Sequence, residues 1–242
     1  MTAALQDVDG LAALPSALRW AGAVLFVASV PLFLILGSVL EVASDRDWME
    51  QEFARYEISR ETGLDAAQLR TVAEAFVEYL RNPSARLDLI VTVGGTSRPL
   101  LNQREIQHME DVQRIFLLVR QLRLVAGGIL LILPLIGIYL AGGAVLPRLG
   151  WLLAAGGILT VALLVLAGLL SLVDFTQAFI AFHRLAFSND LWMLDPRTDY
   201  LVMIFPEGFW FDATMRIAMA SALEALIVTG VGIGLIVLGA RR

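Results

Sequence analysis

Four long apolar stretches constrain the fold of this chain more than any other feature of its sequence. Residues 20–40, 124–146 and 149–173 contain no charged side chain, and residues 217–240 contain only Glu224. A helix that crosses a bilayer needs roughly 20 consecutive apolar residues. The chain is also 58% hydrophobic and only 17% charged, which is typical of membrane proteins. We therefore predict an all-α integral membrane protein with four transmembrane helices and a small α+β extracytoplasmic insertion.

Composition excludes several classes of function. The net charge of −5 argues against nucleic acid as a partner, since that function requires a clustered basic surface. The chain has no cysteine, and all 18 basic residues are arginine. A thiolate nucleophile, a thiolate metal site and a lysine Schiff base are therefore excluded. We predict no cofactor and no metal site.

The polar stretches divide the chain into five segments. Residues 1–43 hold an N-terminal segment and the first transmembrane helix, 44–123 the larger insertion, and 124–173 a hairpin of the second and third helices. Residues 174–215 form an aromatic-rich interfacial insertion, and 216–242 the fourth helix and a cytoplasmic tail. Because Asp7 and Asp9 make a poor signal-peptide n-region, the first helix is expected to remain as an anchor. The short connection Pro147–Arg148 predicts an antiparallel pair.

Periodicity within the larger insertion predicts two helices and a hairpin. Residues 47–62 are expected to form a helix that ends at Gly63, and Asp65 is expected to cap a second helix that ends at Asn82. One face of that second helix is apolar: Leu69, Val72, Phe76, Val77 and Leu80. Alternating residues from 87 to 93, followed by a Gly94–Gly95 turn, predict a β-hairpin.

Arginines in the short segments predict the orientation. Arg19, Arg148, Arg241 and Arg242 share one side of the predicted topology. Because positive residues in short loops stay cytoplasmic, both termini are expected in the cytoplasm and both insertions outside it. Seven of the twelve phenylalanines lie in residues 174–215, where Phe175, Phe179 and Phe182 repeat at helical spacing. This pattern predicts an amphipathic segment at the membrane surface.

The chain has only two histidines, and each lies in one of the two insertions. On a helix, His108 shares a face with Arg104, Glu105 and Asp111. His183 is followed by a cluster of acidic residues. A nearby carboxylate is expected to favour the imidazolium form. A solvated helix end would explain the first segment alone, but two histidines among carboxylates on one side favour a single shared site.

Two sequence blocks resemble a known family. Arg104-Glu105-x-x-His108-Met109-x-Asp111 is followed about seventy residues later by Phe182-His183, Asn189-Asp190-x-Trp192, Asp195-Pro196, Asp199 and Phe205-Pro206-Glu207. These blocks are similar to those of the small bacterial four-helix membrane proteins that include lipoprotein intramolecular transacylase. The resemblance implies an acyltransferase of lipoprotein processing. It would move an acyl chain from the glycerol of a diacylglyceryl lipoprotein to the amine of the N-terminal cysteine, at the outer membrane face.

The resemblance also implies the roles of particular residues. His108 and His183 are the expected catalytic pair, with membrane lipid and the lipoprotein as partners. Supporting residues are expected to be Arg104, Glu105, Asp111, Asn189, Asp190, Asp195, Asp199 and Glu207. Trp192, Phe205 and Glu224 are expected to line a substrate groove, with a helix–helix hydrogen bond as the alternative for Glu224.

The chemistry of the residues is compatible with this transfer. The α-ammonium, with a pKa of about 7.7–8.0, must lose a proton before it attacks an ester, and imidazole titrates in a suitable range to accept it. Two other functions fit the histidines. They are suited to a bis-histidine haem, or with Asp111 or Asp190 to zinc or iron. A non-catalytic membrane assembly protein is the third alternative, for which the face from Leu69 to Leu80 would bind a partner.

Overall fold

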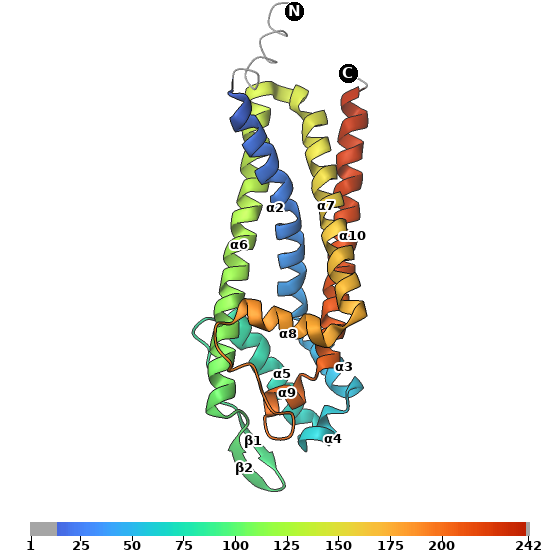
Figure 1. The fold of residues 1–242 in the computed structure, drawn as a ribbon. Coiled ribbons are helices and arrows are strands. Elements are labelled where there is room, and N and C mark those ends of the chain that lie inside the picture. The colour runs from blue at the N-terminus through green and yellow to red at the C-terminus, as the bar shows by residue number, and fades with distance from the viewer. Residues whose placement is uncertain (1–13, 241–242) are drawn as a thin grey trace, which may run out of the picture. The chain divides into compact units, whose positions relative to one another are not determined.

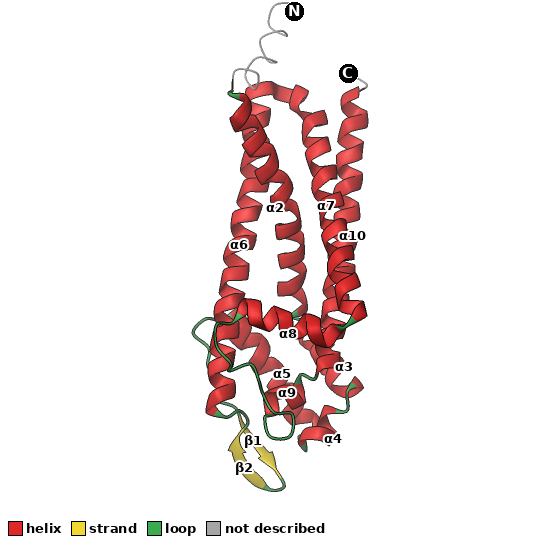
Figure 2. Cartoon of the chain, viewed as in Figure 1, coloured by secondary structure: helices red, strands yellow, loops and turns green. Residues whose placement is uncertain are grey.

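The structure is a computed structural model, which describes residues 14–240. Asp7, Asp9, Arg241 and Arg242, on which two of the predictions above depend, lie outside these residues. The described chain is mostly helical with one two-stranded sheet (Figures 1 and 2). It forms two compact units. We call Met1–Ser38, Arg120–Ala167 and Ala218–Arg242 the membrane unit, and Val39–Val119 and Gly168–Ile217 the head unit.

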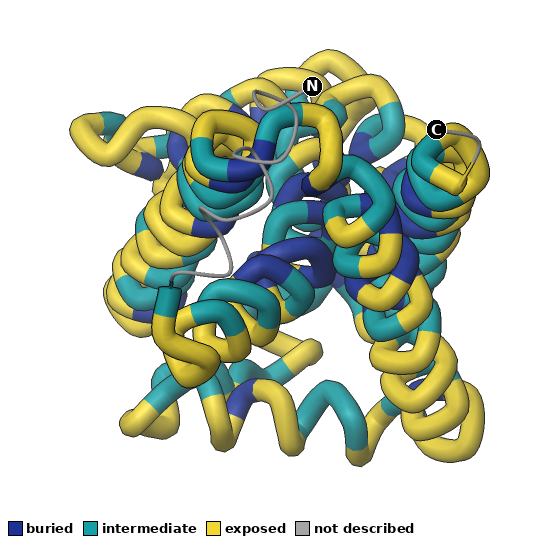
Figure 3. The backbone as a smooth tube through the Cα atoms, turned by 90° about the horizontal axis from the view of Figure 1, so that it is seen from above, coloured by how far each residue is buried: buried dark blue, intermediate teal, exposed yellow. Residues whose placement is uncertain are grey.

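Four long helices supply the membrane unit: α2 (Ser16–Val42), α6 (Gln103–Ala141), α7 (Leu146–Val173) and α10 (Glu207–Ala240). Among residues 14–240, three stretches are long and apolar enough to cross a membrane, and one of them, Gln103–Val173, contains both α6 and α7. Many apolar side chains of this unit are exposed, including Leu124 at 76% and Trp151 at 65%. Exposing so much apolar surface to water would cost free energy, whereas contact with lipid does not. Figure 3 separates the buried positions along the helices from the exposed ones.

Small residues allow α7 and α10 to approach closely within the membrane unit. A Cβ atom added at Gly150 would lie 2.6 Å from the carbonyl oxygen of Gly232, and one added at Gly232 would lie 2.6 Å from the carbonyl oxygen of Gly150. Such backbone contact is typical of membrane helices, which have no hydrophobic drive between them. Ser221 adds a buried hydrogen bond to Ser38, with 2.9 Å between their hydroxyl oxygens.

The predicted position of the turn between α6 and α7 is wrong. The helix ends at Ala141 rather than at Leu146, and a 3₁₀ turn, η1 (Gly142–Val145), makes the connection. Gly142 adopts a φ of 54°, a left-handed conformation that glycine reaches without a Cβ penalty. Pro147 lies in the first turn of α7, where its missing N–H removes no helical hydrogen bond.

The head unit contains α3 (Arg46–Arg55), α4 (Ile58–Thr62), α5 (Ala66–Arg81), β1 (Ile90–Val93), β2 (Thr96–Pro99), α8 (Phe175–Ala186) and α9 (Tyr200–Ile204). The first turns of α6 and α10 also belong to it. The single helix predicted over residues 47–62 is wrong, because Glu57 adopts a φ of 51° and breaks it into α3 and α4. Gly63 ends α4 in the left-handed conformation, as predicted.

The second helix and the hairpin predicted in the larger insertion are present, with the strands limited to Ile90–Val93 and Thr96–Pro99. Asp65 caps α5 in a reciprocal capping box with Gln68, and Asn82 ends the helix. The strands β1 and β2 pair antiparallel, with Val93 opposite Thr96 across the two-glycine turn. The apolar face of α5 is buried in a core that also contains Phe53, Ile204 and Phe209. This core holds the N-terminal half of α6 and the segment after α8 in place.

Candidate active site

His183 lies in the last turn of α8 with only 8% of its surface exposed. Asp174 starts this helix by accepting a hydrogen bond from the backbone N–H of Gln177. The Nδ1 atom of His183 lies 2.8 Å from the carbonyl oxygen of Phe179, one turn earlier. Since a carbonyl only accepts, Nδ1 carries the proton. The Nε2 atom of the neutral ring is therefore a free base.

His108 lies in the second turn of α6 and faces His183. Its surface is 7% exposed, and the two imidazole centroids are 6.2 Å apart. The Nδ1 atom of His108 is buried and has no hydrogen-bond partner among the described residues. A buried polar atom without a partner costs about 1–3 kcal/mol. Such an atom beside a second histidine is a feature of functional sites.

Aromatic rings surround the histidine pair. Phe187 packs edge-on to His108, with 5.0 Å between the centroids. The centroids of Phe179 and Trp192 lie 4.2 Å and 5.0 Å from that of His183. The histidines are therefore enclosed by apolar surface on the sides formed by α8 and the segment that follows it.

This burial decides the charge of the histidines. Loss of hydration and, next in size, the proximity of His183 together lower the pKa of His108 to about 4, and the carboxylate of Asp111 opposes this shift without reversing it. Burial also lowers the pKa of His183, against the opposing hydrogen bond to Phe179. The expectation that neighbouring carboxylates favour imidazolium is wrong, because burial outweighs the charge of Asp111. Both rings are neutral at pH 7, as a proton acceptor must be.

Residues 187–199, which we call the strap, connect α8 to α9 and bind to the start of α6. Arg104 donates to the carbonyl oxygen of Asp190 at 2.6 Å. The side-chain amide of Asn189 donates to Asp111 at 2.8 Å. Four of the predicted supporting residues thus form two hydrogen bonds between the strap and the start of α6. They position the strap, and with it Trp192, against His183.

Glu105 is the most deeply buried of the predicted supporting residues, with 1% of its surface exposed. Its Oε2 accepts from the backbone N–H of Asn102, and its Oε1 from that of Leu201, both at 2.6 Å. The side chain of Asn102 in turn accepts from the N–H of Glu105, which completes a capping box at the start of α6. Burial raises the pKa of Glu105, opposed by these backbone donors. Glu105 therefore joins the start of α6 to the start of α9.

Asn102 was not predicted, although the pattern Asn-x-x-Glu before a helix was a readable signal of a capping box. Its side-chain amide donates to Asp199 at 3.0 Å. Asp199 also accepts from the backbone N–H of Asp195 at 2.8 Å. These bonds close the end of the strap onto α6.

The remaining predicted residues lie further from the pair. Asp195 binds Arg197 in a two-pronged contact, which lowers its pKa to about 2. Glu207 accepts from the hydroxyl of Thr176 at 2.6 Å. Phe205 is buried among Phe53, Phe76 and Phe209 in the core of the head unit. Its expected place in a substrate groove stays a prediction.

Glu224 belongs to the membrane unit and is partly buried in α10. Both of the roles expected for it stay predictions. Within residues 14–240, no three histidine, aspartate or glutamate side chains gather in a group able to hold a metal ion.

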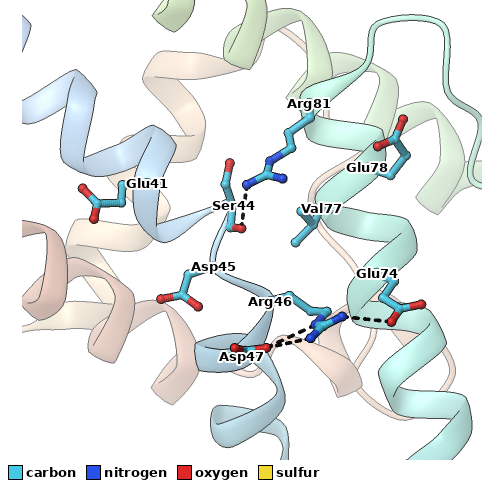
Figure 4. A pocket seen from close by; sticks show the side chains of 9 residues that line it. All are labelled: Glu41, Ser44, Asp45, Arg46, Asp47, Glu74, Val77, Glu78 and Arg81. Carbon is cyan, nitrogen blue, oxygen red and sulfur yellow. Dashed lines mark hydrogen bonds and ion pairs between the residues drawn. The ribbon is translucent and has the colours of Figure 1, made fainter.

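A cavity of about 590 Å³ opens elsewhere in the head unit, where residues before α3 meet α5 (Figure 4). Arg46 binds Asp47 and Glu74 across it, and Arg81 donates to the carbonyl oxygen of Ser44. Neither histidine lines this cavity. Its full lining is Glu41, Ser44, Asp45, Arg46, Asp47, Glu74, Val77, Glu78 and Arg81.

The fold and the site define an integral membrane protein whose head unit encloses a neutral histidine pair among aromatic rings. A sequence profile named lipoprotein intramolecular transacylase Lit matches residues 24–210. The match covers more than half of the chain, so the chain belongs to the lipoprotein intramolecular transacylase family, a family of membrane enzymes that process lipoproteins.

Solved structures share the fold. The lipoprotein intramolecular transacylase Lit of Bacillus cereus superposes with a TM-score of 0.77 at 18% identity, over 94% of this chain and 100% of that one. The same protein with a histidine-to-arginine mutation gives a TM-score of 0.71 at 19% identity, over 91% and 92% of the two chains. An uncharacterized protein of Aquifex aeolicus is 24% identical over 202 residues, which cover 83% of this chain and 88% of the relative.

Proposed function

We propose that this chain moves an acyl chain within a diacylglyceryl lipoprotein, from a glycerol oxygen to the α-amine of the N-terminal cysteine, and releases the lyso-form. The observation that carries the proposal is the pair of neutral imidazoles 6.2 Å apart in a chain of this family. Because amine and ester belong to one molecule, the enzyme needs to supply position and proton transfer but no nucleophile of its own.

His183 acts as the general base in this proposal. Its Nδ1 proton is held by the carbonyl oxygen of Phe179, so Nε2 presents a lone pair to the substrate ammonium. The freed amine nitrogen attacks the ester carbonyl and forms the new C–N bond. The imidazolium releases this first proton to water and then takes the second proton from the attached nitrogen. When the ester C–O bond breaks, the leaving glycerol oxygen takes that proton from Nε2, so the products are a neutral amide and an alcohol.

His108 acts on the oxygen that gains charge. As a neutral imidazole it donates one N–H to the tetrahedral oxyanion, and the aromatic surroundings strengthen that hydrogen bond by excluding water. Mutagenesis of single oxyanion donors in other enzymes lowers kcat by about 100-fold to 1,000-fold. Arg104, Glu105, Asp111 and Asn189 position the strap and the start of α6 around the two rings.

The test is a host that makes only diacylglyceryl lipoproteins, followed by mass spectrometry of its lipopeptides. The wild-type chain should produce N-acylated lyso-lipoprotein, and His108→Ala and His183→Ala should each abolish it. Arg60→Ala, whose side chain is 87% exposed, is the matched control and should keep full activity. Full activity in either histidine variant would refute the mechanism.

The proposal places the head unit outside the cytoplasm, with α2, α6, α7 and α10 as four transmembrane helices and both termini inside. The absence of native cysteine makes the topology directly testable with single-cysteine variants. Ser97→Cys should react with an impermeant thiol reagent in intact cells, whereas Arg148→Cys should react only after permeabilisation. External labelling of position 148 would overturn the orientation.

A further inference from the structure

A second polar network lies in the head unit, where α3 packs on the first turns of α10. Tyr56 donates its hydroxyl to Oδ2 of Asp212 at 2.7 Å, and Nη1 of Arg55 lies 2.9 Å from the same oxygen. Gly208 allows this approach, because a Cβ there would lie 2.5 Å from the ring of Tyr56. None of these residues is assigned a role in acyl transfer.

Glu52 lies beside Asp212 in this network. Its Oε1 is 3.8 Å from the Arg55 nitrogen that binds Asp212, so the two carboxyl groups converge on one guanidinium. Only 7% of Glu52 is exposed. Its Oε2 is buried and receives no hydrogen bond from the described residues. An ionised carboxylate would leave this oxygen without the donor that burial requires.

The charges around Glu52 point the same way. Arg216, from α10, binds Asp45 at 2.5 Å and stacks over the ring of Trp48 at 5.1 Å. Arg55 binds Asp212 at 2.9 Å. Each arginine therefore already has a closer carboxylate partner, and an ionised Glu52 would add an unbalanced negative charge. When two carboxyl groups share a buried site, one of them keeps its proton.

We propose that Glu52 is a protonated carboxylic acid that donates a hydrogen bond to the carboxylate of Asp212. The proton in this bond, shared between the two groups, fixes the start of α10 on α3. Oε2 of Glu52 is then the donor rather than an unsatisfied acceptor. Tyr56, Arg55 and Glu52 together surround the carboxylate of Asp212 with three donors. The pair acts through position and takes no part in the chemistry of the acyl group.

Contacts between aromatic rings connect the start of α10 to His183. Trp210 lies two residues before Asp212, and its ring centroid is 6.3 Å from that of Phe179. The ring centroid of Phe179 in turn lies 4.2 Å from that of His183, and its backbone carbonyl oxygen accepts a hydrogen bond from Nδ1 of His183. Glu52 and Asp212 are thus positioning residues for His183. This role rests on the proposed function, whereas the shared proton does not.

The protonation state is tested by infrared difference spectroscopy of the full chain, purified in a detergent without ester carbonyls. Wild type minus Glu52→Gln at pH 7 should show the carbonyl stretch of one protonated carboxylic acid. A difference spectrum with only carboxylate bands would overturn the shared proton. Because this measurement does not involve the acyl reaction, its outcome is independent of the proposed function.

The pH dependence of stability gives a second readout. Burial raises the pKa of Glu52, and Asp212 raises it further. Above the ordinary glutamate pKa of about 4.3 the unfolded chain ionises while the folded chain keeps the proton. The Tm of wild type should therefore fall with rising pH relative to that of Glu52→Gln, until the folded pKa is passed. A Tm difference that does not change with pH would contradict the proposal.

The positioning role is tested by rescue. Glutamine donates an N–H to Asp212 without titrating, so Glu52→Gln should change kcat by less than about threefold. Glu52→Leu fills the same space without a donor and should lower kcat about tenfold, the equivalent of one hydrogen bond to a charged group. Wild-type kcat in a folded Glu52→Leu protein would refute the positioning role while leaving the histidine mechanism intact.

Discussion

Glu105 is the residue whose loss tests the structure of the site most directly. Its two carboxylate oxygens accept from the backbone N–H groups of Asn102 and Leu201, each at 2.6 Å. These two N–H groups lie at the N-terminal ends of α6 and α9, so one side chain caps the starts of two helices. Removing it with Glu105→Ala leaves the buried N–H of Leu201 without a partner and removes the capping contact to the exposed residue Asn102.

The magnitude follows from that count. The buried donor of Leu201 left unsatisfied costs about 1–3 kcal/mol and the lost cap about 0.5–2 kcal/mol, so Glu105→Ala should lower the free energy of unfolding by roughly 1.5–5 kcal/mol. Glu105→Gln keeps one acceptor oxygen and turns an NH₂ group toward the other donor. Its cost should be about half, roughly 1–3 kcal/mol. Glu110→Ala, an exposed position on the same helix, should stay within about 0.5 kcal/mol.

Denaturant unfolding measures the three free energies, and amide hydrogen exchange locates the loss. In Glu105→Ala, exchange should accelerate at Leu201 and through the strap, but not in the buried face of α5. The order of stability should be Glu110→Ala, then Glu105→Gln, then Glu105→Ala. If Glu105→Ala unfolded like Glu110→Ala and Leu201 stayed protected, the carboxylate would not hold these helices together.

Two further predictions concern the histidine and the membrane unit. Burial lowers the pKa of His108 from 6.5 to about 4. Between these two pH values the histidine is therefore protonated in the unfolded chain and neutral in the folded chain. Acid should therefore destabilise wild type by about 3 kcal/mol more than His108→Phe between pH 7 and pH 4 in denaturant unfolding, and an equal loss in both proteins would contradict this. In the membrane unit, Gly150→Ala places a Cβ 2.6 Å from a backbone oxygen and should cost about 1–3 kcal/mol. The control Gly168→Ala, which meets nothing within 4 Å, should leave Tm unchanged, and equal Tm values for the two would refute the close approach of α7 and α10.

Local signals were sufficient for much of the fold. The apolar stretches lie in helices, and the Asp65 cap, the stop at Asn82 and the two-glycine turn all depend on residues close in sequence. The break at Glu57 was not readable in this way. It adjoins Tyr56, whose hydroxyl binds Asp212, 156 residues further along the chain. The turn between α6 and α7 was misplaced because glycine and proline both interrupt helices. In the structure the chain turns at Gly142, which has a φ of 54°, whereas Pro147 lies in the first turn of α7.

The site shows a similar division. Both histidines and the acidic residues near them were identified from sequence, but their electrostatics were not. His108 is enclosed by Phe187, which approaches it from a distant segment, and that burial reverses the expected direction of its pKa shift. Phe205 stands in a sequence block with the site residues, yet its ring packs into the core. Distant packing therefore decides which aromatic residues border the histidines.

The glycine contacts between α7 and α10 have a consequence for lipid entry. Gly150 and Gly232 bring backbone against backbone, Gly157 packs on Thr229, and Gly239 packs on Pro147. At Gly150 and Gly232 this seam is closed by backbone groups, which no side-chain rotation can move aside. An acyl chain passing between these helices would have to separate the helices themselves. Along α2 and α6, by contrast, Phe33 lies against Gly127 and Arg123 against Gly37, so side chains occupy the contact. Side chains change rotamer within nanoseconds at exposed positions, whereas packed helices shift over microseconds to milliseconds. Of these two seams, the one between α2 and α6 is the more readily opened to a lipid tail.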